Sequence, residues 1–206
     1  MIAEDLLDLA PVIPVVVLED AGAAVPLARA LVEGGLPVIE VTLRTPAALE
    51  AITRIAAEVP DAVVGAGTVV RPEDAERSAA AGARFLVSPG CTPRLQAAMV
   101  ATGLPFLPGV ATASEAIALL EGGITAMKFF PAEAAGGTAY LKSLAGPLPR
   151  IRFCPTGGIG PGNAAEYLAL KNVGCVGGSW LTPADAVRDG DWDRVRGLAE
   201  EAAALR

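Results

Sequence analysis

The chain has 206 residues, of which 52% are hydrophobic, 19% charged and 4% aromatic, and its formal net charge is −7. This composition is too apolar for a disordered chain and too charged for a bundle of membrane helices, and the length suits one domain over residues 1–206. The absence of histidine excludes His-based catalytic triads and histidine metal ligands, and no cluster of lysine and arginine suggests nucleic-acid binding.

The N-terminal segment, residues 1–9, predicts a short amphipathic helix that would close the bottom of a barrel. Ile2, Leu6 and Leu9 would lie on one face of this helix. The segment carries acidic and no basic residues, so it does not resemble a signal peptide, and no apolar run reaches the roughly 18 residues of a membrane span. No two of the three cysteines stand at the short spacing of a metal site, and their odd number argues against a disulfide framework. We therefore expect a cytoplasmic protein without a membrane anchor, metal or other cofactor.

The rest of the chain repeats one pattern. A short apolar run, rich in β-branched residues or bounded by glycine and proline, precedes an Ala- and Leu-rich segment of helical periodicity. The runs follow one another at intervals of 21 to 26 residues and centre on Pro14, Ile39, Val64, Phe85, Phe106, Met127, Phe153 and Cys175. Apolar strands that alternate with helices are typical of a parallel sheet covered on its outer face. The eight units predict an α/β fold, a (β/α)8 TIM barrel with an extra N-terminal helix.

The second predicted strand carries polar residues toward its carboxyl end, where chemistry takes place in such a barrel. Alternation in Val-Ile-Glu-Val-Thr-Leu-Arg directs Glu40, Thr42 and Arg44 to the interior. Glu40 could then exchange protons with a substrate, and Arg44 could bind an anionic group. A structural ion pair across the barrel would use the same two residues, and the spacing does not choose between these interpretations.

Two further strand ends carry residues that could contact a ligand. Thr68 follows the glycines of the third strand, and Pro89 follows the fourth. A hydroxyl and exposed N–H groups at these positions could hold a carboxylate. An ordinary turn between strand and helix accounts for them equally well.

The sixth strand contains Lys128, one of only three lysines in a chain that has 13 arginines. It stands inside the apolar string Ile-Thr-Ala-Met-Lys-Phe-Phe-Pro. Removal from water favours the neutral form of an amine, which is the nucleophile of a Schiff-base enzyme. The alternatives are a lysine that reaches solvent or one that pairs with an acid. Phe130 is predicted to pack over the lysine.

Glycines end the seventh and eighth strands, at Gly157-Gly158 and at Gly177-Gly178-Ser179. Glycine leaves backbone N–H groups accessible to an anion, and the loops after these two strands bind phosphate in many barrels. The pattern therefore predicts a phosphate site, although tight turns alone would also explain it.

Six strings together resemble the 2-keto-3-deoxy-6-phosphogluconate (KDPG) aldolases. They are EVTLRT (40–45), GAGTV (65–69), SPG (88–90), KFFPAE (128–133), CPTGGI (154–159) and GGSW (177–180). The resemblance covers the chain from about Pro14 to Asp193. It departs at the first strand, where some relatives carry an arginine and this chain has Val15, Val16 and Val17.

The resemblance implies roles for particular residues. Lys128 would form the Schiff base, and Glu40 would transfer protons. The remaining positions, all implied to bind substrate, are Arg44, Thr68, Pro89, Phe130, Thr156, Gly157, Gly158, Gly178 and Ser179. Arg44 and Thr68 would hold the pyruvate carboxylate, Thr156 would influence the configuration of the new hydroxyl carbon, and the glycines with Ser179 would hold phosphate.

The implied protein is a homotrimeric class I aldolase. It would reversibly cleave 2-dehydro-3-deoxy-6-phospho-D-gluconate to pyruvate and D-glyceraldehyde 3-phosphate. The resemblance extends to cleavage of 4-hydroxy-2-oxoglutarate (KHG) to pyruvate and glyoxylate. The residues alone leave open an aldolase for a different or unphosphorylated 2-keto acid, a phosphosugar isomerase, and a phosphosugar-binding barrel without catalysis.

Overall fold

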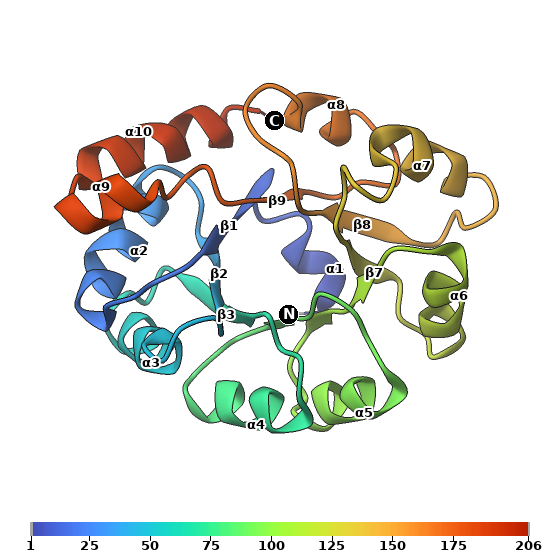
Figure 1. The fold of residues 1–206 in the computed structure, drawn as a ribbon, viewed down its shortest axis with the longest axis horizontal. Helices are drawn as coiled ribbons and strands as arrows, with labels where there is room; N and C mark the ends of the chain where they lie inside the picture. Colours follow the sequence, from blue (N-terminus) through green and yellow to red (C-terminus); the bar gives the residue numbers. More distant parts are fainter. Residues whose placement is uncertain (1, 206) are drawn as a thin grey trace.

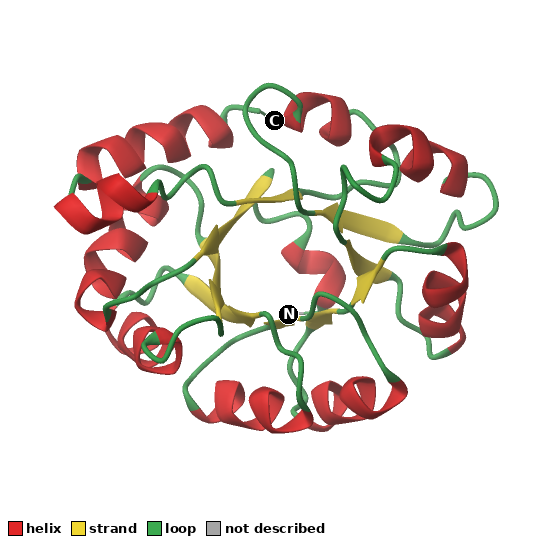
Figure 2. Ribbon diagram, in the orientation of Figure 1, coloured by secondary structure: helices red, strands yellow, loops and turns green. Residues whose placement is uncertain are grey.

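A computed structural model describes residues 2–205 as a ring of parallel strands enclosed by helices (Figures 1 and 2). The strands are β1 (Val12–Val16), β2 (Val38–Thr42), β3 (Val63–Gly67), β4 (Leu86–Val87), β5 (Phe106–Leu107), β6 (Gly109–Val110), β7 (Ala126–Phe129), β8 (Arg152–Pro155) and β9 (Val176–Gly178). Pro108 separates β5 from β6, which together occupy one position in the ring. A proline has no N–H to donate to a neighbouring strand, which accounts for the interruption.

The strands close into a barrel. Six of them pair in the order β5-β4-β3-β2-β1-β9, and three pair in the order β6-β7-β8. All of these pairings are parallel, and parallel bridges between Phe153 and Val173 and between Thr156 and Gly177 join β8 to β9. This arrangement confirms the predicted (β/α)8 barrel, and the predicted strand centres lie within or next to the observed strands.

Helices cover the outer face of the barrel (Figure 2). They are α2 (Ala24–Glu33) after the short 3-10 turn η1 (Ala21–Ala23), α3 (Ala48–Glu58), α4 (Pro72–Ala80), α5 (Pro93–Ala101), α6 (Ala113–Glu121), α7 (Gly137–Leu144), α8 (Ala164–Leu168), α9 (Ala184–Asp189) and α10 (Trp192–Ala203). Within the described part of the chain, no helix is long and apolar enough to cross a membrane.

The buried apolar residues form two clusters, as the alternation of strand side chains requires. The larger cluster lies between the strands and the surrounding helices and includes Ile39, Val41, Met127 and Phe129. The smaller cluster fills the barrel interior, and its members are Leu6, Leu7, Ile13, Val38, Phe85, Val87, Leu107, Ala126, Cys154 and Cys175. Inner and outer strand faces are therefore both buried.

The N-terminal helix α1 (Ala3–Leu6) belongs to the inner cluster and closes the barrel at the amino ends of the strands. Its predicted apolar face was wrong in part. Leu6 and Leu7 are fully buried, whereas Ile2 and Leu9 are 61% and 44% exposed. The helix is a single turn that ends at Leu6, so Leu6 and the capping residue Leu7 are buried together and the longer helical periodicity does not apply.

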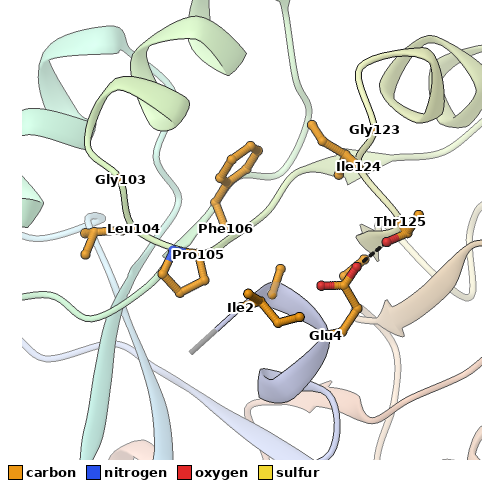
Figure 3. Close-up of a pocket in the computed structure, with 11 residues that line it drawn as sticks. Ile2, Glu4, Gly103, Leu104, Pro105, Phe106, Gly123, Ile124 and Thr125 are labelled. Carbon is orange, nitrogen blue, oxygen red and sulfur yellow. Dashed lines mark hydrogen bonds between the residues drawn. The ribbon is translucent and has the colours of Figure 1, made fainter.

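A cavity of about 280 Å³ lies beside α1 at this end of the barrel (Figure 3). The Thr125 hydroxyl donates a hydrogen bond to the Glu4 carboxylate on its wall. Ile2 and Phe106 contribute apolar surface to the same cavity. The contact between Glu4 and Thr125 ties α1 to the start of β7.

Candidate active site

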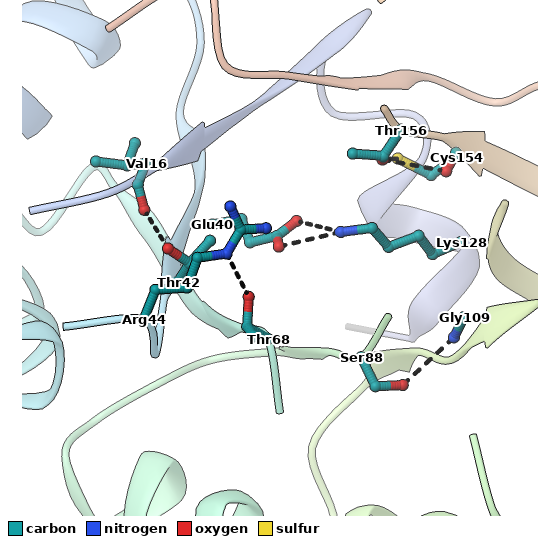
Figure 4. Close-up of polar contacts among 10 residues, drawn as sticks. All are labelled: Val16, Glu40, Thr42, Arg44, Thr68, Ser88, Gly109, Lys128, Cys154 and Thr156. Carbon is teal, nitrogen blue, oxygen red and sulfur yellow. Dashed lines mark hydrogen bonds and ion pairs between the residues drawn. The ribbon is translucent and has the colours of Figure 1, made fainter. Parts of the chain in front are cut away.

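A buried ion pair crosses the barrel interior near the carboxyl ends of the strands. Lys128 comes from β7 and Glu40 from β2. The Lys128 Nζ lies 3.2 Å from Glu40 Oε1 and 3.5 Å from Oε2, and the two side chains point toward each other (Figure 4). Their exposed fractions are only 5% and 4%. The structure thus brings together the two residues for which catalytic roles were predicted.

Strand alternation places both side chains inside. In β7, Met127 and Phe129 pack in the outer cluster, so Lys128 faces the interior. In β2, Ile39 and Val41 pack in the outer cluster, so Glu40 faces Lys128. The prediction that the interior receives Glu40 is confirmed.

Glycines on the inner face make room for these polar groups. A Cβ added to Gly67 would lie 2.1 Å from Glu40 Oε1, well inside contact distance. A Cβ added to Gly177 would lie 2.2 Å from Thr156 Oγ1. Side chains at these positions would occupy the space that the carboxylate and the hydroxyl now fill.

The charges of the pair are compensated chiefly by one another. Among the described residues, no other lysine or arginine is buried. The Phe130 ring lies beside the amine, with its centroid 5.5 Å from Nζ, as the prediction of packing over the lysine required. At hydrogen-bond distance the carboxylate can take a proton from the ammonium, which leaves a neutral amine beside a carboxylic acid. Such a couple can attack a carbonyl carbon and then supply a proton to the oxygen that leaves.

Arg44 and Thr68 form a second polar group at the same end of the barrel. Arg44 is exposed just beyond β2, and its Nε donates to Thr68 Oγ1 over 3.2 Å (Figure 4). Thr68 has a φ of +58°, a left-handed conformation that a β-branched residue rarely adopts. Backbone strain of this kind is concentrated at functional sites. Arg44 contacts Thr68, and among residues 2–205 it forms no ion pair with Glu40, which was the alternative interpretation of these two residues.

Pro89 lies half-buried in the loop after β4. A Cβ added to Gly109 would lie 2.3 Å from the carbonyl carbon of Pro89. Gly109, in β6, pairs in register with Lys128 in β7. Ser88 Oγ accepts a hydrogen bond of 3.3 Å from the Gly109 N–H (Figure 4). The loop that contains Pro89 is thus held against the strand next to the lysine.

The glycine turns after β8 and β9 lie side by side. The bridge between Thr156 and Gly177 joins them, and Gly157 and Gly158 have φ values of +103° and +79°. Within residues 2–205, the N–H groups of Gly157, Gly158 and Ser179 donate no hydrogen bond. This arrangement provides accessible N–H donors for an anion.

Gly178 and Thr156 are both buried, whereas Ser179 is exposed at the mouth. The Trp180 ring fills the position that a Gly178 Cβ would need, 1.8 Å away. The Thr156 hydroxyl donates a hydrogen bond of 3.5 Å to the Cys154 carbonyl, and its oxygen lies 4.0 Å from the Cys154 sulfur (Figure 4). All the predicted substrate-binding positions therefore lie at strand ends on the carboxyl side of the barrel.

Sequence reasoning missed two residues behind these turns. The Tyr167 hydroxyl, in α8, donates a hydrogen bond to Glu133 Oε1 in the loop after β7. The available signal was an acid two residues after Pro131 in KFFPAE, together with a single tyrosine in a short helix. Neither position shows by itself that the two side chains meet.

Of the three cysteines, Cys154 and Cys175 are buried in the barrel interior, and Cys91 is half-buried. Burial raises the pKa of the Cys91 thiol to about 11. A thiol with so high a pKa stays protonated near neutral pH and is a poor nucleophile.

Comparison with known proteins identifies the family. The family model described as KDPG and KHG aldolase matches residues 3–198. The 2-dehydro-3-deoxy-phosphogluconate aldolase of Dickeya dadantii is 55% identical over 203 residues, which cover 98% of this chain and 95% of that protein. The KHG/KDPG aldolase of Escherichia coli K12 is 53% identical over 201 residues, covering 97% of this chain and 94% of that protein.

Solved structures agree with this similarity. The KDPG aldolase of Legionella pneumophila, with pyruvate captured as a covalent carbinolamine intermediate, has a TM-score of 0.96 at 44% identity and covers 98% of each chain. That of Zymomonas mobilis ZM4 with 3-phosphoglycerate has a TM-score of 0.93 at 48% identity and covers 99% of this chain and 96% of that one. The match to the family model, the sequence identity and the shared fold show that this chain belongs to the KDPG and KHG aldolase family.

Proposed function

We propose that this chain is a class I aldolase that reversibly cleaves 2-dehydro-3-deoxy-6-phosphogluconate to pyruvate and glyceraldehyde 3-phosphate. The observation that carries the proposal is the buried contact of 3.2 Å between Lys128 Nζ and Glu40 Oε1. The Legionella relative, in which pyruvate is captured as a carbinolamine, supports covalent chemistry of this kind. The family's second substrate, 4-hydroxy-2-oxoglutarate, would use the same amine.

The first half of the reaction makes the covalent bond. Glu40 takes a proton from the Lys128 ammonium, and the neutral amine attacks the C2 ketone of the substrate. A carbinolamine forms, and the proton held by Glu40 helps its hydroxyl to leave as water. The product is a protonated imine, which can accept the electron pair of a bond at the neighbouring carbon.

The second half breaks the carbon–carbon bond. Glu40, directly or through a water, takes the proton of the C4 hydroxyl, and the C3–C4 bond breaks to release the aldehyde. The electron pair of that bond moves into the imine and gives an enamine. Glu40 returns the proton to C3, and hydrolysis of the resulting imine frees pyruvate and the lysine amine. One carboxylate serves each step because every transfer restores the state that the next step needs.

The pyruvate end of the substrate would bind at Arg44 and Thr68. A guanidinium and a hydroxyl at hydrogen-bond distance from each other suit a carboxylate, which can accept from both. Pro89 and Phe130 would bound this part of the site, and Phe130 already lies beside the amine. Thr156 would contact the hydroxyl whose configuration the reaction sets.

The phosphate end would bind at Gly157, Gly158, Gly178 and Ser179. The available N–H groups of these turns and the Ser179 hydroxyl suit an anion with several acceptor oxygens. The Zymomonas relative with 3-phosphoglycerate supports a ligand that combines three carbons with a phosphate.

The main alternative is that Lys128 and Glu40 form a purely structural ion pair. Reduction with borohydride in the presence of pyruvate distinguishes the two. The proposal expects a stable adduct on Lys128 in the intact protein, located by peptide mass spectrometry. Lys128→Ala should abolish the adduct and aldehyde release, whereas Lys142→Ala, which removes an exposed lysine on α7, should leave both intact. An adduct on another residue, or no adduct at all, would contradict the assignment of Lys128 as the Schiff-base lysine.

An aldolase for unphosphorylated 2-keto acids remains the second candidate, because the family description includes KHG. The two are separated by comparing kcat/KM for the phosphorylated and unphosphorylated substrates and by testing inorganic phosphate as a competitor. Ser179→Ala should weaken only the phosphorylated substrate if the turn after β9 binds phosphate.

The family resemblance further supports a homotrimer in the cytoplasm. Light scattering after size-exclusion chromatography should then give three times the 20.8 kDa mass of the chain. A mass equal to one chain across the concentration range would reject the trimer.

A further inference from the structure

The loop after β7 is bound to the glycine turn after β8 by contacts that involve neither Lys128 nor Glu40. The Ala132 N–H donates to the Thr156 carbonyl over 2.8 Å, and the Glu133 N–H donates to the Gly157 carbonyl over 3.1 Å. The loop that begins directly after the lysine strand therefore lies against the turn proposed to bind phosphate.

Side-chain packing strengthens this connection. A Cβ added to Gly158 would lie 2.6 Å from Glu133 Cγ and 2.7 Å from its Cβ. The Glu133 side chain thus covers the Gly158 backbone at contact distance. Any larger residue at position 158 would displace Glu133, besides being strained at a φ of +79°.

Tyr167 fixes the far end of the Glu133 side chain. Its hydroxyl donates to Glu133 Oε1, and the whole residue is 0% exposed although it lies in the short helix α8. Burial, and then the hydrogen bond to Glu133, raise the pKa of Tyr167, so the hydroxyl remains a donor. Gly137 packs against the same contact, since its added Cβ would lie 3.4 Å from the Tyr167 oxygen.

The turn is held on its other side by Asn163. Asn163 Nδ2 donates to the Gly158 carbonyl over 3.1 Å, and Asn163 Oδ1 accepts from the Gly160 N–H over 2.9 Å. These bonds use the carbonyl of Gly158 and leave its N–H available. Glu133 and Asn163 together determine where the N–H donors of the turn stand relative to Lys128.

We propose that Glu133, held by Tyr167, is a positioning residue that sets the Gly157-Gly158 turn at the correct distance from Lys128 for a phosphorylated substrate. The inference rests on the proposed function, because it assumes that this turn binds the phosphate. A substrate with phosphate at one end and a ketone at the other must meet both sites at once. A misplacement of about 1 Å can cost a factor of about 100 in rate. A substrate without phosphate needs only the lysine end.

The test compares two substrates in four variants. Glu133→Ala and Tyr167→Phe should each lower kcat/KM for the phosphorylated substrate by about tenfold or more, mainly through KM, because the turn is no longer held in place. The same variants should change kcat/KM for 4-hydroxy-2-oxoglutarate by less than about threefold. Glu133→Gln keeps an acceptor for the Tyr167 hydroxyl and should recover most of the loss. Glu166→Ala removes an exposed acid from the same helix and is the matched control.

Two measurements separate this proposal from the function on which it rests. Wild-type protein must form the Lys128 adduct with pyruvate, and inorganic phosphate must compete with the phosphorylated substrate. Failure of either contradicts the proposed function and the positioning role with it. If both hold, an equal loss on both substrates in Tyr167→Phe, or full activity in Glu133→Ala, overturns the positioning role alone. Tyr167→Phe removes a single oxygen, so it provides the test even if Glu133→Ala does not fold.

Discussion

The two ends of the barrel interior differ in polarity. At the amino ends of the strands, Leu6 of α1 and the residue after it, Leu7, belong to one apolar cluster with strand residues such as Ile13 and Val38. At the carboxyl ends, a lysine and a glutamate meet among glycines. The first arrangement removes apolar surface from water, and the second removes two charges from it, which is costly without the pairing. Apolar packing therefore closes the amino end of the barrel interior, whereas the groups proposed for catalysis lie at the carboxyl end.

The largest effect is expected when the charges of Lys128 and Glu40 are removed from the carboxyl end of the barrel. Lys128→Met leaves Glu40 buried without its partner and should lower the free energy of unfolding by about 3–5 kcal/mol. The double variant Lys128→Met, Glu40→Leu should recover most or all of that loss, because two apolar groups replace a buried ion pair. Both variants should lack aldolase activity. Denaturant unfolding and an aldehyde-release assay measure the two effects, and a double variant as unstable as the single one would contradict this account.

At the amino end of the barrel, the corresponding change removes an apolar side chain. Leu7→Ala should lower the free energy of unfolding by about 2–5 kcal/mol, because it leaves a cavity in the inner cluster. The kcat/KM of the folded protein should change little, since the substitution lies at the other end of the barrel. Leu9→Ala, at a residue that is 44% exposed, is the control and should have a small effect on stability. Loss of catalysis without loss of stability in Leu7→Ala would refute the division between the two ends.

A single added methyl group tests whether catalysis requires the space that Gly67 leaves for the Glu40 carboxylate. The Cβ introduced by Gly67→Ala would lie 2.1 Å from Glu40 Oε1, so the carboxylate must move. We expect kcat to fall by about 100-fold, because a displacement of about 1 Å is enough for such an effect. Gly146→Ala adds the same group where nothing lies within 4 Å and should leave kcat unchanged. Wild-type rates in Gly67→Ala would show that Glu40 does not need its observed position.

The smallest effect is expected at the N-terminal cap of α6, on the outer surface of the barrel. Glu115 accepts from the N–H groups of Ala111 and Thr112 at the start of α6, and these hydrogen bonds lower its pKa. A lowered folded-state pKa means that the stabilisation is present above the unfolded pKa and is lost as the pH falls through the folded value. Because Glu115 is exposed and its charge is screened by solvent, Glu115→Ala should reduce stability by only about 0.5 kcal/mol near neutral pH and by less in acid. Thermal unfolding at several pH values measures this, and a pH-independent difference would exclude the carboxylate as its source.

Most of the fold could be predicted because it depends on local patterns. Apolar runs near Pro14, Ile39 and Val64 became β1, β2 and β3, since periodicity and spacing are properties of short segments. The error in the apolar face of α1 has the same origin. The sequence suggests a helix over residues 1–9, but the helix is one turn long, and only the space inside the barrel selected Leu7 over Leu9 for burial.

The candidate site was predictable where one residue is unusual in its own segment. A lysine in an apolar strand and an acid in an alternating strand are visible without any structure, and so Lys128 and Glu40 could be named. Glu133 and Tyr167 could not, because an acid in a loop and a tyrosine in a helix are ordinary in isolation. Their significance comes from a contact between residues 34 apart in the chain.

The amino-acid sequence by itself determined the order of strands and helices, the inward direction of Glu40 and Lys128, and membership of an aldolase family. These follow from hydrophobic periodicity, side-chain alternation and shared motifs, each of which is a property of a short segment of the sequence. Only the tertiary structure decided that the amine and the carboxylate lie 3.2 Å apart, that Gly67 leaves room for them, and that Tyr167 holds Glu133 against Gly158. Those facts depend on closure of the barrel, which brings distant strand ends together, and no segment contains that information alone.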